Sequence, residues 1–194
     1  MADRERRGAP PYGAEFQART VVMDSDDIGR AIRRMAHEIV ERNHGLDAVA
    51  LVGLQTGGVP LAEAIAADLS EIESVTVEVG RLDVAFYRDD IGLRPVLTEE
   101  VTDIAFDVDN RVIVLVDDVL FTGRTIAAAL DAMKEVGRPR SVQLAVLIDR
   151  GHRELPIQAD HVGRQLQAPA EARVNVKLTE IDDHDAVTIS VPEA

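Results

Sequence analysis

The sequence contains no cysteine and no tryptophan, and aromatic residues make up only 3% of it. Without cysteine, the chain has no disulfides, no nucleophilic thiol and no thiolate ligands for zinc or iron–sulfur clusters. So few aromatic side chains also argue against a stacking platform for single-stranded nucleic acid. The function must therefore lie outside thiol chemistry.

Positive charge is also scarce, since 21 lysine and arginine residues stand against 35 aspartate and glutamate residues, for a formal net charge of −14. A surface of this sign repels a phosphate backbone, so nucleic-acid binding requires a segregated basic face. No run reaches 18 apolar residues, and a glycine- and proline-rich stretch follows the basic N-terminus where a signal peptide needs an apolar region. We therefore expect a cytoplasmic protein without a membrane partner.

The length of 194 residues suits one domain. Residues 1–18 are poor in apolar side chains, which predicts a mobile tail ahead of a domain over residues 19–194. Within that domain, apolar strand-like runs (48–54, 75–79, 82–87, 112–116, 141–148) alternate with helical patterns (24–43, 60–69, 125–136). This alternation predicts an α/β fold with a mostly parallel central sheet and helices on both faces.

The segment 111–125 carries the clearest chemical signal. Asp117 and Asp118 come directly after five apolar residues, and a Thr-Gly-Arg-Thr turn, residues 122–125, leads into the next helix. Ligands of parallel sheets bind beyond the carboxyl ends of the strands, and the amides of a helix N-terminus favour phosphate. The pattern therefore indicates a sugar phosphate, with its hydroxyls bound by the acids and its phosphate by the amides.

Paired acids after a strand also occur in phospho-receiver domains, where they bind magnesium, so Asp117 and Asp118 alone leave that alternative open. A receiver also needs a second-site lysine, and neither Lys134 nor Lys177 directly follows a key strand. The turn is not a Walker loop, because Gly-Lys-Ser/Thr is missing, and it lacks the Gly-x-Gly-x-x-Gly dinucleotide fingerprint. The receiver interpretation is therefore the weaker one.

Two acids followed by this turn resemble the phosphoribosyl-diphosphate signature of type I phosphoribosyltransferases. The resemblance narrows to one subfamily, the bifunctional pyrimidine operon regulatory proteins/uracil phosphoribosyltransferases. It is carried by residues 36–43, 87–90, 112–125 and 143–157 and extends over roughly residues 20–192. Residues 149–157, Asp-Arg-Gly-His-Arg-Glu-Leu-Pro-Ile, are its most specific piece, because other phosphoribosyltransferases share only the diphosphate signature.

The resemblance implies a type I phosphoribosyltransferase fold with a small hood, and the reaction of uracil with phosphoribosyl diphosphate to give UMP and pyrophosphate, with Mg²⁺. Asp117 and Asp118 would be catalytic, because they would bind the ribose hydroxyls near the positive charge that develops at C1. Their contact with the metal would be made through the bound substrate. The base would lie under a hood built from residues after Ile148, its edge near the backbone of Asp149 and Arg150. The expected contacts to phosphoribosyl diphosphate or UMP are Thr56, Gly57, Arg88, Asp117, Asp118, Val119, Leu120, Phe121, Thr122, Gly123, Arg124, Thr125, Asp149 and Arg150.

Residues 55–58, Gln-Thr-Gly-Gly, occupy the place of the family's pyrophosphate loop, where small residues let amides approach the diphosphate. Many relatives have arginine where Gly57 stands, so we expect weaker pyrophosphate contacts, or contacts supplied by Arg88 or Arg94. Without the resemblance, the glycines fit an ordinary strand-to-helix turn, and residues 149–152 fit a capped loop with a surface ion pair.

The subfamily also binds a stem-loop in the leader of pyrimidine-biosynthesis mRNA, promoted by UMP or UTP, and the resemblance implies the same partner here. Arg34 and His37 lie on the face of the first helix opposite its apolar stripe, and Arg42 lies a turn beyond. Together with His152 and Arg153, these residues match the family's RNA-contacting surface. The resemblance further implies a homodimer or homotetramer.

Two observations keep alternatives open. A charged helix face is usually only solvated, and Gln158 stands where RNA-binding relatives carry arginine. The alternatives are an RNA-binding attenuator with little catalysis and a salvage enzyme without RNA binding.

Overall fold

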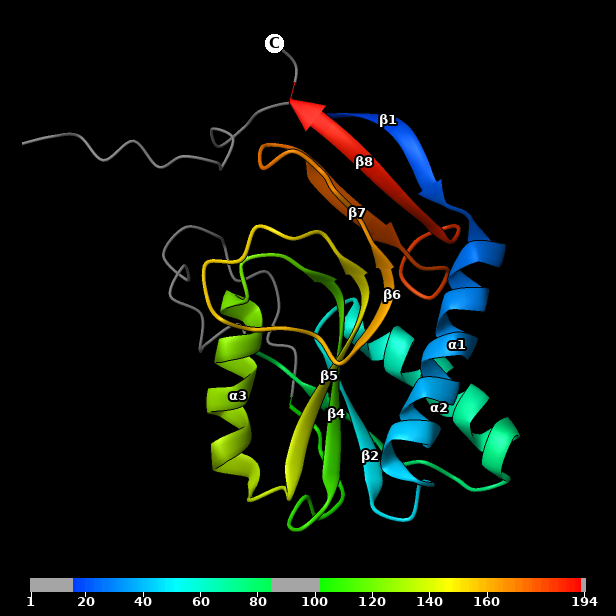
Figure 1. Ribbon diagram of the computed structural model, residues 1–194, viewed down its shortest axis with the longest axis vertical. Helices are drawn as coiled ribbons and strands as arrows, with labels where there is room; N and C mark the ends of the chain where they lie inside the picture. Colours follow the sequence, from blue (N-terminus) through cyan, green and yellow to red (C-terminus); the bar gives the residue numbers. More distant parts are fainter. Residues whose placement is uncertain (1–15, 85–101, 193–194) are drawn as a thin grey trace, which may run out of the picture.

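The computed structural model describes residues 16–84 and 102–192, which form a layered α/β core and a small hood (Figure 1). The core sheet has five parallel strands in the order β3-β2-β4-β5-β6. They are β2 (Val49–Leu54), β3 (Val79–Leu82), β4 (Val112–Leu120), β5 (Ser141–Asp149) and β6 (His161–Gln165). The predicted parallel sheet is confirmed, and the strand that carries Asp117 and Asp118 is its central one.

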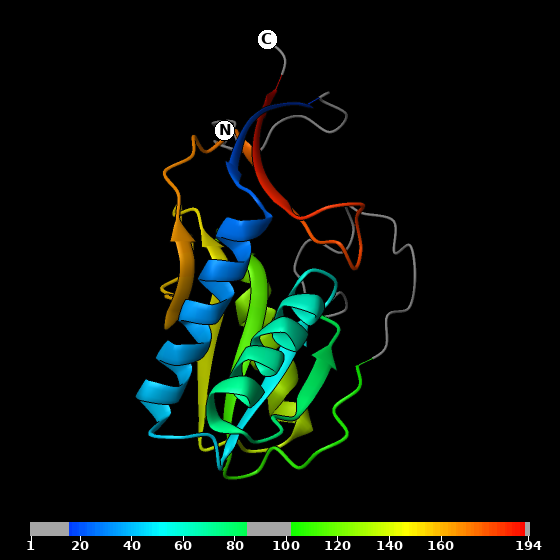
Figure 2. The same ribbon diagram turned by 90° about the vertical axis from the view of Figure 1, so that its right-hand side faces the viewer.

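Helices cover both faces of this sheet, as predicted. α1 (Ser25–Asn43) and α2 (Gly58–Glu73) lie side by side on one face, and α3 (Arg124–Val136) lies on the other (Figures 1 and 2). Neighbouring residues of β4 enter different cores, because Val114 packs with α1 and α2 whereas Leu115 packs with α3. None of the helices in the described part of the chain is long and apolar enough to span a bilayer.

Helix α1 follows directly from its sequence. The Asp24 side chain accepts the Asp27 N–H at 2.9 Å, and the Asp27 side chain accepts the Asp24 N–H at 3.4 Å, which is a capping box. Its buried stripe consists of Ile28, Ala31, Ile32, Met35, Ala36 and Ile39. The helix ends where His44 takes a left-handed conformation, φ 55°, one residue before Gly45.

The hood is a three-stranded antiparallel sheet beyond the carboxyl ends of β4 and β5 (Figure 1). Its order is β1-β8-β7, with β1 at Phe16–Met23, β7 at Arg173–Lys177 and β8 at Ala186–Pro192. The expectation that the hood comes only from residues after Ile148 is therefore wrong, because β1 precedes the first helix. β1 also begins two residues before the predicted end of the tail at residue 18.

The predicted bounds of two strands and of one helix are wrong. Helix α2 continues to Glu73, beyond the predicted residue 69, and only Val79 of the predicted strand 75–79 is in β3. β3 ends at Leu82, so the predicted strand 82–87 is not formed at Asp83 and Val84, and its other residues lie outside the described ones. Short apolar runs do not distinguish a strand from a buried connection.

Candidate functional site

Asp117 and Asp118 lie at the carboxyl end of β4, which continues through them to Leu120. Asp117 is 8% exposed and accepts the Asp118 N–H at 3.0 Å, while Asp118 accepts the Val119 N–H at 2.7 Å. Burial raises the pKa of the Asp118 carboxyl, and the neighbouring hydrogen-bond donors oppose that shift in part. The backbone therefore fixes both carboxylates at the end of the central strand.

The loop between β2 and α2 lies directly against this strand end. A Cβ atom on Gly57 would stand 2.7 Å from Asp118 Oδ2, and one on Gly58 would stand 2.1 Å from the Val116 carbonyl oxygen. The Gln55–Thr56 peptide bond in the same loop is cis. The structure thus brings the predicted pyrophosphate loop beside Asp118. At Gly58 the Val116 backbone leaves room only for a hydrogen, whereas at Gly57 the Asp118 side chain would have to move.

Residues 122–125, here called the phosphate loop, connect β4 to α3. Gly123 is the N-cap residue of α3 and has φ 91°, a left-handed conformation that glycine adopts readily. A Cβ atom there would lie 3.3 Å from the Ile157 side chain. The Arg124 N–H donates to Thr122 Oγ1 at 3.3 Å, so the loop turns tightly into the helix N-terminus, as predicted.

The segment 149–157 supports the phosphate loop from outside. The N–H groups of Glu154 and Leu155 donate to the Thr122 carbonyl at 3.0 and 3.1 Å. Arg124 Nε pairs with Glu154 Oε2 at 2.8 Å. The most specific piece of the sequence resemblance is thus bonded to the loop that the motif predicts to hold phosphate.

Asp149 and Arg150, the residues expected near the uracil edge, already form several hydrogen bonds and an ion pair within the chain. The Arg150 N–H donates to the Leu120 carbonyl at 3.1 Å, and the Asp149 carbonyl accepts the Leu166 N–H at 2.8 Å. Asp149 Oδ2 pairs with Arg153 at 2.7 Å. Arg88 and Arg94, expected to supply pyrophosphate contacts, lie outside the described residues.

The residues expected to contact RNA fall into two groups. Arg42 pairs with Asp160 at 2.7 Å, and Asp160 also accepts the N–H of Leu144, the fourth residue of β5, at 2.9 Å. Arg153 instead pairs with Asp149 at the end of β5, about 17 Å further along that strand at 3.3 Å per residue. The groups are Arg34, His37 and Arg42 on α1, and His152 and Arg153 beside the phosphate loop.

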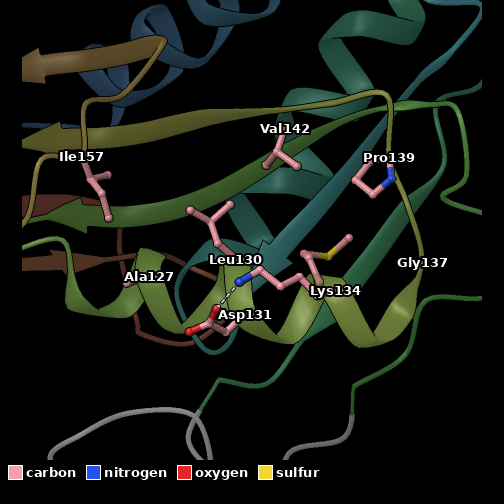
Figure 3. Close-up of a pocket in the computed structure, with 9 residues that line it drawn as sticks. Ala127, Leu130, Asp131, Lys134, Gly137, Pro139, Val142 and Ile157 are labelled. Carbon is pink, nitrogen blue, oxygen red and sulfur yellow. Dashed lines mark hydrogen bonds and ion pairs between the residues drawn. The ribbon is translucent and has the colours of Figure 1, made fainter.

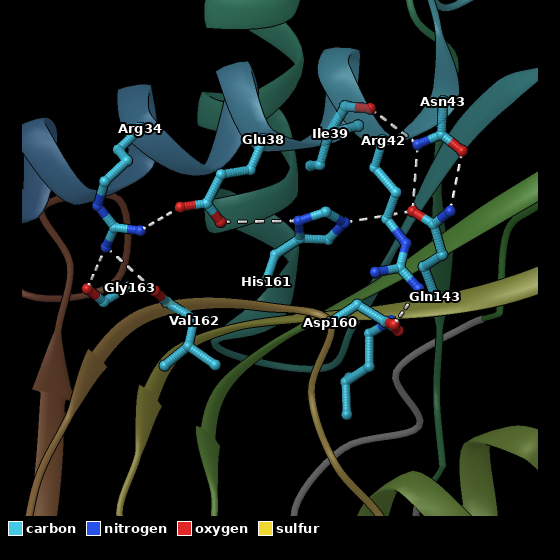
Figure 4. A network of polar contacts seen from close by, with 11 residues as sticks. Arg34, Glu38, Ile39, Arg42, Asn43, Gln143, Asp160, His161, Val162 and Gly163 are labelled. Carbon is cyan, nitrogen blue, oxygen red and sulfur yellow. Dashed lines mark hydrogen bonds and ion pairs between the residues drawn. The ribbon is translucent and has the colours of Figure 1, made fainter.

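A polar network between α1 and the sheet was not predicted (Figure 4). His161 at the start of β6 is 2% exposed, and its Nε2 lies 3.2 Å from Gln143 Oε1. Gln143 also pairs with Asn43, and Arg34 bonds to backbone carbonyls of β6. The sequence signal was a single glutamine in the otherwise apolar run 142–148.

An apolar hollow of about 480 Å³ lies between α3 and the start of β5 (Figure 3). Leu130, Val142, Pro139 and Ile157 line it, and the Asp131–Lys134 ion pair belongs to its lining. Neither Asp117 nor Asp118 lines it, so it is not part of the candidate site.

Comparisons with known proteins agree with this geometry. The phosphoribosyl transferase domain family matches residues 22–184. The bifunctional protein PyrR of Roseiflexus sp. is 58% identical over 162 residues, covering 83% of this chain and 88% of that protein. PyrR of Deinococcus radiodurans is 50% identical over 178 residues, covering 90% and 96%, and PyrR of Bacillus cereus is 48% identical over 177 residues, covering 90% and 98%.

Solved structures support the fold independently. The hypoxanthine phosphoribosyltransferase of Trypanosoma cruzi in complex with IMP superimposes with a TM-score of 0.69 at 18% identity, covering 92% of this chain and 94% of that one. At this identity the likeness concerns the fold alone, whereas the sequence matches are high and extend over most of both chains. The chain therefore belongs to the phosphoribosyl transferase family and, within it, to the bifunctional PyrR proteins.

Proposed function

We propose that the carboxyl end of β4 binds phosphoribosyl diphosphate and transfers its phosphoribosyl group to uracil, releasing UMP and pyrophosphate. One observation carries the proposal: Asp117 and Asp118 lie near the carboxyl end of the central strand, beside the glycine loop of residues 55–58 and just before the phosphate loop. A sugar phosphate with a diphosphate at C1 needs these three elements side by side. Membership of the PyrR family supports the choice of substrates.

The chemistry suits carboxylates rather than a nucleophile. Departure of pyrophosphate from C1 leaves positive charge on the ribose, as in glycosyl transfer. Asp117 and Asp118, fixed by backbone donors and largely removed from water, would accept the ribose hydroxyls and stabilise that charge. The amides that open α3 would hold the 5′-phosphate. Positioning and electrostatics therefore supply the rate enhancement.

Mg²⁺ fits this site only as a partner of the substrate. Among residues 16–84 and 102–192, no group of three or more histidines or carboxylates is placed to hold a metal. Magnesium prefers oxygen ligands and commonly binds one or two carboxylates together with substrate phosphates. Asp117 and Asp118 offer that donor set beside the diphosphate position, and the ion would neutralise the leaving group.

The test is UMP formation by the wild type and by Asp118→Asn, with and without Mg²⁺. Asp118→Asn keeps the shape of the side chain but removes the negative charge, so most activity should be lost. Asp131→Asn on the exposed side of α3 is the control and should retain activity. Equal UMP formation without Mg²⁺, or strong preference for hypoxanthine over uracil, would contradict the proposal.

We further propose that the chain binds leader RNA of a pyrimidine operon when UMP or UTP occupies this site. The observation in favour is the basic group on α1, where Arg34 and Arg42 are about half exposed on an acidic protein. Both are paired with acids, Glu38 and Asp160, so RNA phosphates would share or replace those partners. An enzyme without RNA binding, or an attenuator with little catalysis, remains the alternative outcome.

A gel-shift titration with UMP present decides between these outcomes. Arg42→Ala should weaken RNA binding and leave uracil transfer intact, because the Arg42 side chain pairs with Asp160, which is not one of the expected substrate contacts. Gln158→Arg should strengthen binding by adding a cation at an exposed position. Affinity should also fall as salt rises, since phosphate contacts release counterions. Absence of any RNA binding would leave only the transferase activity.

Sedimentation of the same sample tests the expected homodimer or homotetramer.

A further inference from the structure

The aromatic ring just before the phosphate loop is held on two sides. The Arg150 guanidinium lies over the Phe121 ring, with Cζ 4.1 Å from the ring centroid. The His152 imidazole meets the same ring edge-on at a centroid distance of 6.3 Å. Both side chains belong to the segment 149–157, and Phe121 directly precedes Thr122 of the phosphate loop. The loop is therefore anchored through its aromatic neighbour as well as through its backbone.

The same two side chains also hold the chain that enters the hood. Arg150 donates to the carbonyls of Pro169 and Ala172, each at 2.8 Å, and His152 Nε2 lies 2.8 Å from the Ala168 carbonyl. Residues 168–172 lead directly into the hood strand β7. Arg150 and His152 thus connect the phosphate loop to the hood, two parts of the molecule about 50 residues apart in the sequence.

Burial prevents the Arg150 side chain from acting on the substrate itself. Arg150 is 6% exposed, and its Nε atom has no hydrogen-bond partner among the described residues. Burial lowers the pKa of its guanidinium, which nevertheless stays charged at neutral pH because the ordinary value is so high. A buried cation is costly unless carbonyls and an aromatic face replace water, and Phe121 supplies that face.

We propose that Arg150 is a positioning residue for phosphoribosyl transfer, which keeps the phosphate loop in place by clamping Phe121 against the segment 168–172. This inference deepens the proposed function and rests on it. The phosphate loop holds the 5′-phosphate alike before and during the reaction, because that phosphate does not take part in bond making or breaking. Loss of the clamp therefore weakens binding of the ground state and of the transition state equally. It raises KM for phosphoribosyl diphosphate more than it lowers kcat.

The experiment compares three variants with a matched control. Arg150→Met removes the charge and the donors, Arg150→Lys keeps a cation above the ring, and Phe121→Leu keeps apolar bulk without the aromatic face. The control is Arg111→Met, because Arg111 also lies over a phenylalanine ring, Phe106 at 5.3 Å, but at the amino end of β4. KM, kcat and the melting temperature are measured for each, and calorimetry gives the affinity for phosphoribosyl diphosphate directly.

Arg150→Met and Phe121→Leu should each raise KM for phosphoribosyl diphosphate by about tenfold, with kcat changed much less. Arg150→Lys should recover part of the loss, and the double variant should be no worse than Arg150→Met, because both changes break one contact. Arg111→Met should lower only the melting temperature. An unchanged KM in Phe121→Leu and Arg150→Lys overturns the inference, even if Arg150→Met does not fold. A wild type that neither binds phosphoribosyl diphosphate nor forms UMP overturns the proposed function instead.

Discussion

Because the imidazole of His161 is buried, we expect the free energy of unfolding to decline as the pH falls below about 6.5. The polar network of Figure 4 determines which nitrogen of the ring carries the proton. Asn43 Nδ2 donates to the Ile39 carbonyl at 2.8 Å, and Gln143 Nε2 donates to Asn43 Oδ1 at 2.8 Å, which makes Gln143 Oε1 the acceptor. His161 Nε2 therefore donates to Gln143 at 3.2 Å, and the neutral ring has a bare Nδ1.

That Nδ1 atom lies 3.8 Å from Glu38 Oε2 and has no hydrogen-bond partner among the described residues. Protonation would create a donor for Glu38, and the charges of Glu38 and Asp160 favour it. Burial and the charge of Arg42 oppose it, and burial is the largest effect, so the pKa of His161 is lowered from 6.5. The folded protein therefore holds this ring neutral at pH values where the unfolded chain takes up a proton.

The sign and size of the effect follow by linkage. Above about pH 6.5 both states hold the ring neutral, and His161 contributes nothing to the pH dependence. Below it the unfolded state binds more protons, so stability falls with a slope of at most about 1.4 kcal/mol per pH unit. Between about pH 7.5 and about pH 5.5 the loss is at most about 1.4 kcal/mol, and it stops once the folded protein also takes up the proton.

Urea unfolding of the wild type and of His161→Gln at a series of pH values measures this contribution. Glutamine keeps a donor for Gln143 but does not titrate, so the stability difference between the two proteins should shift toward the variant as the pH falls. His37→Gln, on the exposed side of α1, is the matched control for replacing one histidine by glutamine. A wild-type–variant difference that stays constant, or NMR titration of His161 at or above pH 6.5, would refute the reasoning.

Two further predictions concern the candidate site. Gly58→Ala should destabilise the fold by about 1–3 kcal/mol in urea unfolding, because its Cβ meets the Val116 carbonyl at 2.1 Å. Gly29→Ala in α1, where nothing lies within 4 Å, should instead be neutral or stabilising, and equal effects at both sites would count against the close approach. Asp118→Asn should raise the melting temperature of the ligand-free protein at neutral pH, since it removes a carboxylate whose pKa burial raises; a lower melting temperature would show that the charge stabilises the fold.

The central strand, the acids and the phosphate loop could be predicted because their signals are local. Five apolar residues, two aspartates and a Thr-Gly-Arg-Thr turn lie within 14 residues, and each type has a conformational or chemical reason to be there. Helix α1 was predictable for the same reason, since its cap and its apolar stripe lie within one segment.

The roles of Arg150 and of β1 could not be predicted, because their partners are distant in the sequence. In the sequence Arg150 looks like an ordinary surface arginine, and only the fold brings the carbonyls of Pro169 and Ala172 to its guanidinium. β1 is stabilised as a strand only by pairing with β8, about 170 residues later. β6 was missed because His161, Arg164 and Gln165 break the apolar pattern, although α1 covers this edge strand.

The pairing of β1 with β8 also has a consequence for the order of events on the ribosome. β1 is made first, yet its backbone partner, Ala186–Pro192, is made after every other described strand. The parallel core from β2 to β6 can therefore form before β8 is available, whereas the hood waits for β8. The nascent protein thus acquires its sheet and phosphate loop first, and the cover over them is completed by the last strand to emerge.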